Sequence, residues 1–248
     1  MDFQGRTVIV TGGASGIGRA TALLLAHGGA RIFIGDIDEE GGRSAAAEAV
    51  AAGFAVEFLP LDLTSRSSVD EFASAVHAQV EPIDGLVNAA GWDAIQPFLE
   101  NPPEMWDRII AINLMGAIRL TRGVLPPMVA ARAGKIVNIS SDAGRVGSMG
   151  ETVYAAAKGG LIAFTKSLAR EMARYRINVN CVCPDPTDTP LFQRQPERMK
   201  EALTRAIPFR RIARPIEIAE AVAFFLSDRA NYITGQVLSV SGGLTMAD

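Results

Sequence analysis

Cysteine and histidine are scarce in this sequence of 248 residues, with two of each. Cys181 and Cys183 alternate within the apolar stretch 177–183, where a strand would place both side chains on one face, so we expect two buried free thiols. His27 and His77 stand in unrelated helical patterns, without the spacing of metal ligands. The sequence therefore predicts no metal site.

A basic excess and a long apolar run are also missing. The 24 Lys and Arg residues face 27 Asp and Glu residues, a net charge of −3, whereas domains that bind nucleic acid usually carry a positive excess. Charged residues, Gly or Pro interrupt each apolar run before the roughly 18 residues that a membrane span needs. Residues 1–6 lack the basic start of a signal peptide. We therefore expect no nucleic-acid partner, no membrane segment and a cytoplasmic location.

Short β-branched runs alternate with amphipathic stretches along the chain, as in repeated strand–helix–strand units. The predicted strands are Thr7–Val10, Ile32–Ile34, Val56–Leu59, Leu86–Val87, Ile136–Ile139, Ile177–Val182 and Val237–Val240. They are apolar on both faces, as strands of a covered parallel sheet are. No composition break divides residues 1–248. The sequence therefore predicts one α/β domain of the Rossmann type, a doubly wound parallel sheet of seven strands with helices on both faces.

A glycine loop joins the first predicted strand to the first predicted helix, in the sequence Thr11-Gly12-Gly13-Ala14-Ser15-Gly16-Ile17-Gly18. Gly12 would permit a tight turn, Gly16 would let backbone N–H groups approach a pyrophosphate, and Gly18 would allow the helix to pack closely on the sheet. A glycine triplet alone is weak evidence, but its place between a strand and a helix indicates a dinucleotide site.

Asp36 ends the second predicted strand, eighteen residues beyond Gly18. A carboxylate there accepts hydrogen bonds from the adenosine ribose and repels a 2′-phosphate, which favours NAD over NADP. Arg31 begins that strand and is poorly placed to bind a 2′-phosphate. The alternative is that Asp36 is only a turn residue at a strand end.

Four motifs in the same order resemble the short-chain dehydrogenase/reductase family, and the resemblance covers essentially the full chain. They are the glycine pattern Thr11–Gly18, Asp62 after the third predicted strand, Asn88-Ala89-Ala90-Gly91 after the fourth, and Tyr154-x-x-x-Lys158 with Ser141 and Asn113 upstream. Ala89 stands where the family more often has a second Asn.

The resemblance implies a catalytic group of Asn113, Ser141, Tyr154 and Lys158. In the family, the residues at these positions support a water in a proton relay, hydrogen-bond the substrate oxygen, act as the base and bind the nicotinamide ribose. It also implies cofactor contacts from Gly12, Ser15, Gly16, Ile17, Gly18, Asp36, Ile37, Asp62, Leu63, Asn88, Ala89, Gly91, Tyr154, Lys158, Pro184, Thr187 and Thr189. Each catalytic residue has an ordinary alternative: a surface aromatic, a solvated charge, a strand-end cap or a buried amide.

The chemistry of Tyr154 and Lys158 can be argued without the family. Oxidation of a secondary alcohol removes the hydroxyl proton while hydride leaves carbon, so a base must lie beside the alcohol oxygen. A free tyrosine has a pKa of about 10 and is mostly protonated at pH 7. We expect Lys158, one helical turn away, to lower the pKa of Tyr154 by its charge.

One position departs from the family pattern. After the sixth predicted strand the chain reads Pro184-Asp185-Pro186, where the family usually has Pro-Gly. A carboxylate at position 185 is expected to crowd the close approach of backbone and cofactor. The substitution is a tolerated variant, a residue that shapes the substrate site or an engineered change.

Substrate specificity is expected in the loops beyond the strand ends. The candidate pocket residues are Trp92, Arg145, Met149 and Phe192, with the segment 187–214 as a lid over the site. The lid holds seven basic residues against three acidic ones, a net charge of +4. This excess would attract an anionic substrate, unless it is simply a solvated helix face.

Several local strings, among them Gly91-Trp92-Asp93, look like alicyclic 2-hydroxyacyl-CoA dehydrogenases and the nearby 1-arylethanol dehydrogenases. The leading hypothesis is an NAD-dependent enzyme that interconverts a small-molecule secondary alcohol and its ketone. A 3-oxoacyl-thioester reductase is an alternative, which normally prefers NADP. A catalytically silent NAD-binding scaffold is an alternative of another class. The family resemblance also implies a homotetramer.

Overall fold

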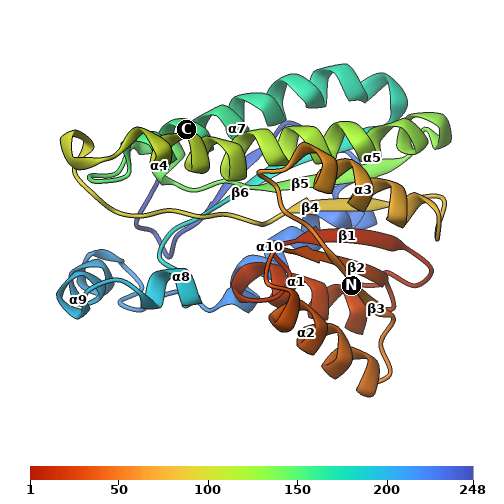
Figure 1. Ribbon diagram of the computed structural model, residues 1–248, viewed down its shortest axis with the longest axis horizontal. Coiled ribbons are helices and arrows are strands. Elements are labelled where there is room, and N and C mark those ends of the chain that lie inside the picture. The colour runs from red at the N-terminus through yellow and green to blue at the C-terminus, as the bar shows by residue number, and fades with distance from the viewer. Residues whose placement is uncertain (248) are drawn as a thin grey trace.

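The structure is a computed structural model and describes residues 1–247. Its single sheet has seven parallel strands in the order β3-β2-β1-β4-β5-β6-β7, so the prediction of a doubly wound Rossmann sheet is confirmed (Figure 1). The strands are β1 (Thr7–Thr11), β2 (Arg31–Asp36), β3 (Val56–Pro60), β4 (Gly85–Asn88), β5 (Gly134–Ile139), β6 (Ile177–Pro184) and β7 (Val237–Val240). Each predicted run lies within its observed strand, apart from differences at the ends.

Helices cover both faces of the sheet, with α1, α2 and α10 below it and α3, α5 and α7 above it in Figure 1. The helices are α1 (Gly16–His27), α2 (Glu39–Ala51), α3 (Arg66–His77), α4 (Pro103–Ile110), α5 (Ala117–Ala131), α6 (Ala143–Val146), α7 (Thr152–Met172), α8 (Pro190–Gln193), α9 (Glu197–Ala206) and α10 (Pro215–Leu226). Successive residues of β1 point into opposite layers, since Val8 and Val10 join one core and Ile9 joins the other. Both faces of the central strands are therefore buried.

The two edge strands depart from the prediction that all seven strands are buried on both faces. In β7 no residue is fully buried and Leu238 is 41% exposed, and in β3 only Val56 and Phe58 are buried. Each has a neighbouring strand on one side only, so helices cover it incompletely.

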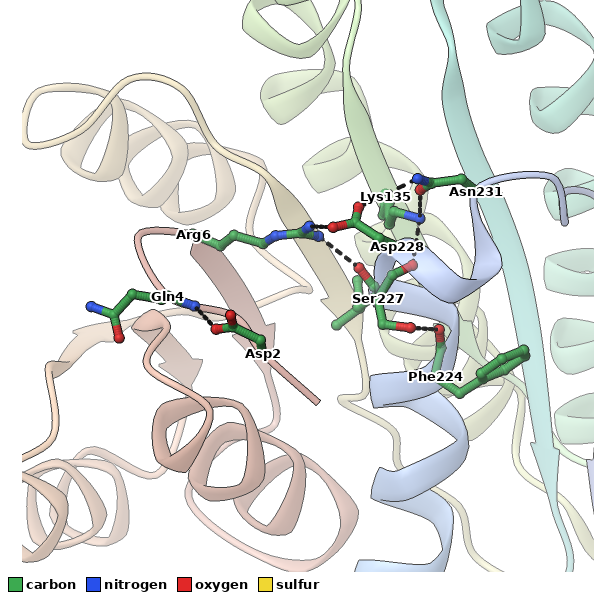
Figure 2. A network of polar contacts seen from close by, with 9 residues as sticks. Asp2, Gln4, Arg6, Lys135, Phe224, Ser227, Asp228 and Asn231 are labelled. Carbon is green, nitrogen blue, oxygen red and sulfur yellow. Dashed lines mark hydrogen bonds and ion pairs between the residues drawn. The ribbon is translucent and has the colours of Figure 1, made fainter.

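A buried lysine ties β5 to the end of α10. Lys135 donates hydrogen bonds to the Ser227 carbonyl oxygen (2.8 Å) and to Asn231 Oδ1 (2.7 Å), while Arg6 pairs with Asp228 at 2.5 Å (Figure 2). Burial lowers the pKa of Lys135 to about 8. Because a helix ends in unpaired carbonyl oxygens with partial negative charge, these two cations lie where they stabilise α10.

Residues 103–131 form one long helix of α4, a π-helical segment (Ala111–Gly116) and α5. By length and composition alone this stretch is apolar enough to cross a membrane. Its buried side chains Leu120, Val124 and Met128 belong to the core cluster shared with α3. Packing against the sheet therefore explains this apolar face in a globular domain.

Cys181 and Cys183 lie on the same face of β6, with their sulfur atoms 3.9 Å apart, and both are buried free thiols as predicted. The hydrogen bond between the two thiols and burial raise the pKa of Cys183. Among the described residues no group of three or more metal-ligating side chains comes together.

Candidate active site

A cleft of about 1130 Å³ opens at the carboxyl ends of the strands, where the chain order reverses between β1 and β4. It brings together residues from eight segments of the chain. Of the residues predicted to bind cofactor, all but Asn88 line it. Of the predicted catalytic residues, Ser141, Tyr154 and Lys158 line it, and Asn113 does not.

The glycine loop has the shape that a dinucleotide requires. Gly12 and Gly16 adopt positive φ angles of 69° and 54°, and a Cβ at Gly12 would lie 2.8 Å from the Ala90 backbone. A Cβ at Gly18 would lie 2.2 Å from the Gly12 carbonyl oxygen, so only glycine lets α1 pack this closely. The Ser15 side chain makes no cap hydrogen bond, which leaves its hydroxyl and the first N–H groups of α1 free for a phosphate. The loop therefore fits a pyrophosphate.

Asp36 lies at the end of the cleft that the adenosine would fill. Its Oδ2 accepts a hydrogen bond from the Ala14 N–H (3.0 Å) and its Oδ1 accepts one from the Asp38 N–H (3.1 Å), so the carboxylate is held in place. The only basic side chains that line the cleft among the described residues are Arg108 and Lys158. Neither belongs to the segments around Asp36, so no basic side chain among the described residues that line the cleft lies beside this carboxylate.

Tyr154 and Lys158 project from the first turns of α7 into the opposite end of the cleft. Lys158 Nζ lies 5.5 Å from the Tyr154 ring centroid and donates a hydrogen bond to the Ile139 carbonyl oxygen at 2.9 Å. Ser141 Oγ accepts a hydrogen bond from the Ala143 N–H (3.1 Å), so its proton is available for donation. The three side chains therefore converge on one region of the cleft.

The expectation that Lys158 lowers the pKa of Tyr154 is not met in this structure. Burial raises the pKa of Tyr154, and the carboxyls of Glu151 and Asp93 raise it further, although hydrogen bonding to Ser141 opposes them. Burial also lowers the pKa of Lys158 to about 8. The main cause is the burial of the phenol, to which the two nearby carboxyls add.

Asn113 lies outside the cleft, in the π-helical segment, and is 1% exposed. Its Nδ2 donates to the carbonyl oxygens of Trp92 (2.7 Å) and Ile109 (3.0 Å), and its Oδ1 accepts from the Trp92 N–H (3.2 Å). The side chain therefore holds the loop after β4. A role of Asn113 in a proton relay stays a prediction.

Asn88 also differs from the prediction, since its side chain points into the core and not into the cleft. Its Nδ2 donates to Asn138 Oδ1 (2.8 Å) and to Thr121 Oγ1 (3.1 Å), and Asn138 in turn donates to Thr165 Oγ1 (2.8 Å). This buried chain joins β4, β5, α5 and α7. Asn88 therefore supports the cleft from behind.

Two of the four predicted pocket residues line the cleft and two do not. Trp92 and Phe192 line it, and the Arg108 guanidinium lies 4.2 Å over the Trp92 ring. Arg145 points away and donates to Ser239 Oγ at 2.6 Å, whereas Met149 is 94% exposed on a loop. Arg145 is thus bound at the sheet edge, and the Met149 loop turns its side chain to solvent.

The segment 187–214 leaves and rejoins the domain at one place. Thr187 pairs with Ala213, and the Asp188 N–H donates to the Ala213 carbonyl oxygen at 2.8 Å. Between these ends, α8 and α9 extend away from the body of the domain (Figure 1). Phe192, Met199 and Leu203 of this segment line the cleft.

The predicted basic lid is not basic toward the cleft. None of its seven basic side chains lines the cleft. Four of them pair with glutamates, in the ion pairs Lys200–Glu197, Arg205–Glu201, Arg211–Glu217 and Arg214–Glu217. The positive excess of this segment therefore lies outside the cleft, as expected for a solvated helix face.

Acidic side chains outnumber basic ones among the described residues that line the cleft, and four of the acidic ones form two pairs. Asp93 faces Glu151, and burial together with Glu151 raises the pKa of Asp93 to about 7. Asp185 faces Asp142, and burial together with Asp142 raises the pKa of Asp185 to about 7. Like charges this close favour one shared proton per pair.

Asp185 is accommodated without the strain that its place in a glycine position suggests. Its φ angle is not among the positive ones, so the backbone there accepts any residue. Its Oδ2 accepts a hydrogen bond from Thr245 Oγ1 at 2.9 Å, which ties the end of β6 to the C-terminal segment. The side chain thus joins a network beside the cofactor site.

Sequence reasoning missed several residues that shape the cleft. Thr11 Oγ1 accepts hydrogen bonds from the N–H groups of Ala89 (3.0 Å) and Ala90 (3.1 Å), which closes the switch point between β1 and β4. Leu244 and Thr245 line the cleft from the C-terminal segment, far from any motif. The place of Thr11 at the head of the glycine loop was a usable signal, whereas no local pattern marks Leu244 or Thr245.

Known proteins share this whole fold. The protein-family model described as enoyl-(acyl carrier protein) reductase matches residues 12–245. A solved structure of a candidate gluconate dehydrogenase from Agrobacterium tumefaciens superposes with a TM-score of 0.94 at 32% identity, covering 98% of this chain and 97% of that one.

Curated relatives match this chain over all or nearly all of their own length. The 3-oxoacyl-[acyl-carrier-protein] reductase FabG of Thermotoga maritima is 39% identical over 99% of this chain and 100% of its own. The cyclopentanol dehydrogenase of Comamonas sp. is 38% identical over 97% of each chain. With the glycine loop, the Ser141, Tyr154 and Lys158 side chains and these relatives taken together, the chain belongs to the short-chain dehydrogenase/reductase family of oxidoreductases, which bind a nicotinamide cofactor.

Proposed function

We propose that the protein is an NAD-dependent dehydrogenase that interconverts a secondary alcohol and its ketone. The observation that carries this proposal is the convergence of Ser141, Tyr154 and Lys158 on the cleft that the glycine loop opens. The cleft offers a hydrogen-bond donor, a proton-transfer group and an ammonium group in one place. A carbonyl or carbinol oxygen needs these groups at its transition state.

The cofactor supplies the hydride acceptor when it is bound, and the side chains of this chain handle the proton. Tyr154 takes the hydroxyl proton of the alcohol, or returns it to the ketone oxygen, while Ser141 orients that oxygen by a hydrogen bond. Lys158 has three N–H donors and uses one on the Ile139 carbonyl oxygen, so two remain for ribose hydroxyls. Its charge then favours the phenolate form of Tyr154.

Asp36 supports NAD as the cofactor. Its carboxylate accepts hydrogen bonds from ribose hydroxyls and repels a 2′-phosphate, and no basic side chain of the described cleft lies nearby to offset that repulsion.

A 3-oxoacyl-thioester reductase is the second candidate, and the FabG of Thermotoga maritima, identical at 39% of positions, favours it equally. Such a reaction uses the same Tyr154 and Ser141 on a ketone. The cofactor separates the two candidates, because Asp36 disfavours NADP.

The resemblance to a cyclopentanol dehydrogenase supports cyclic secondary alcohols as substrates, beside 1-arylethanols. Cyclic 2-hydroxyacyl-CoA esters lose the support that a basic lid would have provided, because the lid cations face away from the cleft.

The silent-scaffold alternative is disfavoured by the site itself, because Ser141, Tyr154 and Lys158 are all present and line the cleft together.

We further propose a homotetramer. Exposed apolar side chains near the C-terminus, Tyr232 at 105% and Met246 at 85% exposure, support an assembly surface there. Light scattering after size exclusion tests the oligomeric state.

The deciding experiment follows the absorbance of NADH and NADPH with a panel of substrates: cyclopentanol, cyclohexanol, 1-phenylethanol, a cyclic 2-hydroxyacyl-CoA and acetoacetyl-CoA. We expect turnover of alcohols with NAD and little with NADP. Reduction of only acetoacetyl-CoA with NADPH would establish the reductase instead. Absence of all turnover, with intact NADH binding, would establish the scaffold.

A further inference from the structure

The carboxyls of Asp93 and Glu151 are held side by side by the backbone of two loops. Asn113 binds both the N–H and the carbonyl oxygen of Trp92, which fixes the residue before Asp93. The Gln96 N–H donates to the Gly150 carbonyl oxygen at 2.9 Å, which fastens the loop after β4 to the start of α7. The pair is therefore part of the rigid frame of the cleft.

Apart from the proton that the two carboxyls share, neither side chain has a hydrogen-bond partner among the described side chains. Both oxygens of Asp93 are buried and accept no hydrogen bond from a described residue. Glu151 is the N-cap residue of α7, yet its side chain makes no cap hydrogen bond. Buried polar atoms without partners are costly, and in native structures they commonly mark a missing ligand or a functional group.

The pair lies within reach of the reacting atoms. Both residues line the cleft with Tyr154, and Glu151 precedes Tyr154 by one helical turn, a separation that places neighbouring side chains about 5–6 Å apart. The charged and titratable groups that face the pair are Tyr154 and Lys158. An oxygen bound to Tyr154 therefore has the Asp93–Glu151 pair beside it.

The charge of the side chains that line the cleft determines which functional groups of a ligand bind there. Among the described residues that line it, acidic side chains outnumber basic ones by seven to two. Two carboxyls that share one proton still offer free lone pairs, which accept hydrogen bonds and repel an anion. A hydroxyl or an ammonium group satisfies them, whereas a methylene leaves them unpaired.

We propose that the Asp93–Glu151 pair selects substrates that carry a second hydrogen-bond donor, a hydroxyl or an ammonium group, on the carbon next to the reacting carbinol. The proposal rests on the alcohol dehydrogenase function above and narrows its substrate class to vicinal diols and amino alcohols. A site built around a hydrogen bond discriminates strongly against an analogue that lacks the donor, by at least about tenfold.

The test compares cyclohexanol, trans-1,2-cyclohexanediol and trans-2-aminocyclohexanol as substrates of the holoenzyme. In the wild type we expect kcat/KM for the diol or the amino alcohol to exceed that for cyclohexanol by about tenfold or more. Asp93→Leu is expected to remove this preference, so that the ratio of kcat/KM for the diol or the amino alcohol to that for cyclohexanol falls to about one. Preference for the amino alcohol alone would assign the donor as an ammonium group, and preference for the diol alone would assign it as a hydroxyl.

Two controls keep the outcomes separate. Glu104→Gln removes a carboxylate that is exposed on α4 outside the cleft and is expected to leave the preference unchanged. Asp93→Asn preserves the shape should the leucine variant fold poorly, and NADH fluorescence checks the fold of each variant.

A binding measurement separates this proposal from the function it rests on. If no alcohol turns over, but the diol in the presence of NADH raises the Tm of the wild type and not of Asp93→Leu, the dehydrogenase function fails and the role of the pair stands. Equal kcat/KM for diol and cyclohexanol in the wild type, or equal loss of both in Asp93→Leu, overturns the proposal.

Discussion

The ammonium of Lys158 lies 5.5 Å from the ring centroid of Tyr154 and donates a hydrogen bond to the Ile139 carbonyl oxygen. In this arrangement the pKa of Lys158 falls to about 8 and that of Tyr154 rises, because both groups are buried. The phenol therefore holds its proton in the free protein. Activation of Tyr154 as a base must come from positive charge that lies beside the phenol when ligands bind.

Tyr154→Phe is expected to reduce turnover by at least about 100-fold, because it removes the proton-transfer group while keeping the ring. Binding of NADH should stay within about twofold, since the phenol is not the main cofactor contact. Steady-state kinetics and NADH fluorescence titration measure the two effects. Appreciable residual activity would show that another group is the base.

Glu151→Gln is expected to move the pH profile of alcohol oxidation toward acid. The charge of Glu151 raises the pKa of Tyr154, so its removal favours the phenolate and lowers that pKa. The pH at which kcat is half-maximal should fall by about 0.5–1 unit. A profile that does not move, measured with cyclohexanol to avoid the second donor, would contradict this electrostatic role.

Asp36→Ala is expected to weaken the preference for NAD. Loss of one charge-assisted hydrogen bond to the ribose should lower kcat/KM with NAD by about tenfold, and loss of the repulsion should raise it with NADP. The ratio of kcat/KM values for the two cofactors measures the switch. Asp38→Ala, a neighbouring carboxylate that does not line the cleft, is the matched control.

Asp185→Asn is expected to stabilise the protein at neutral and alkaline pH but not at acidic pH. The pKa of Asp185 in the folded state is raised to about 7, so the folded state binds this proton more tightly than the unfolded chain and loses stability as pH rises from about 4 to 7. The amide removes that loss and keeps an acceptor for Thr245. We expect a Tm gain of about 2–4 °C at pH 8 and none at pH 4.5, measured by calorimetry.

A second substitution at the same position tests the cofactor site. Asp185→Gly is expected to tighten NAD binding or leave it unchanged, because it removes a carboxylate beside the cofactor cleft. A clear loss of affinity in an equilibrium titration would assign Asp185 a positive role.

Lys135→Ala is expected to destabilise the fold by about 2 kcal/mol, because it leaves the buried Ser227 carbonyl oxygen without its donor and also removes the hydrogen bond to Asn231. Urea unfolding followed by circular dichroism measures the change. Lys166→Ala, which removes an exposed lysine from α7, should change stability by less than about 0.5 kcal/mol. Equal effects of the two variants would contradict a role for Lys135 in anchoring α10.

Strand positions were predictable because a covered parallel strand needs an unbroken apolar run, and Ile136–Ile139 or Ile177–Val182 can form little else. The glycine loop was predictable for a similar reason, since the close contacts at Gly12 and Gly18 admit no other residue. Side-chain direction in loops was not, because it depends on distant contacts. Arg145 turns toward Ser239, ninety-four residues away, and Asn88 turns into the core toward Thr121.

The sequence by itself determined the order of the elements, the glycine loop and the residues Ser141, Tyr154 and Lys158, because these depend on local patterns and on spacing within one strand or helix. Only the tertiary structure decided the electrostatics of the cleft. It turned the basic side chains of segment 187–214 toward solvent and brought Asp93 to Glu151 and Asp142 to Asp185. The physical reason is that charge interactions depend on distance in space, which only the packing of separate loops establishes.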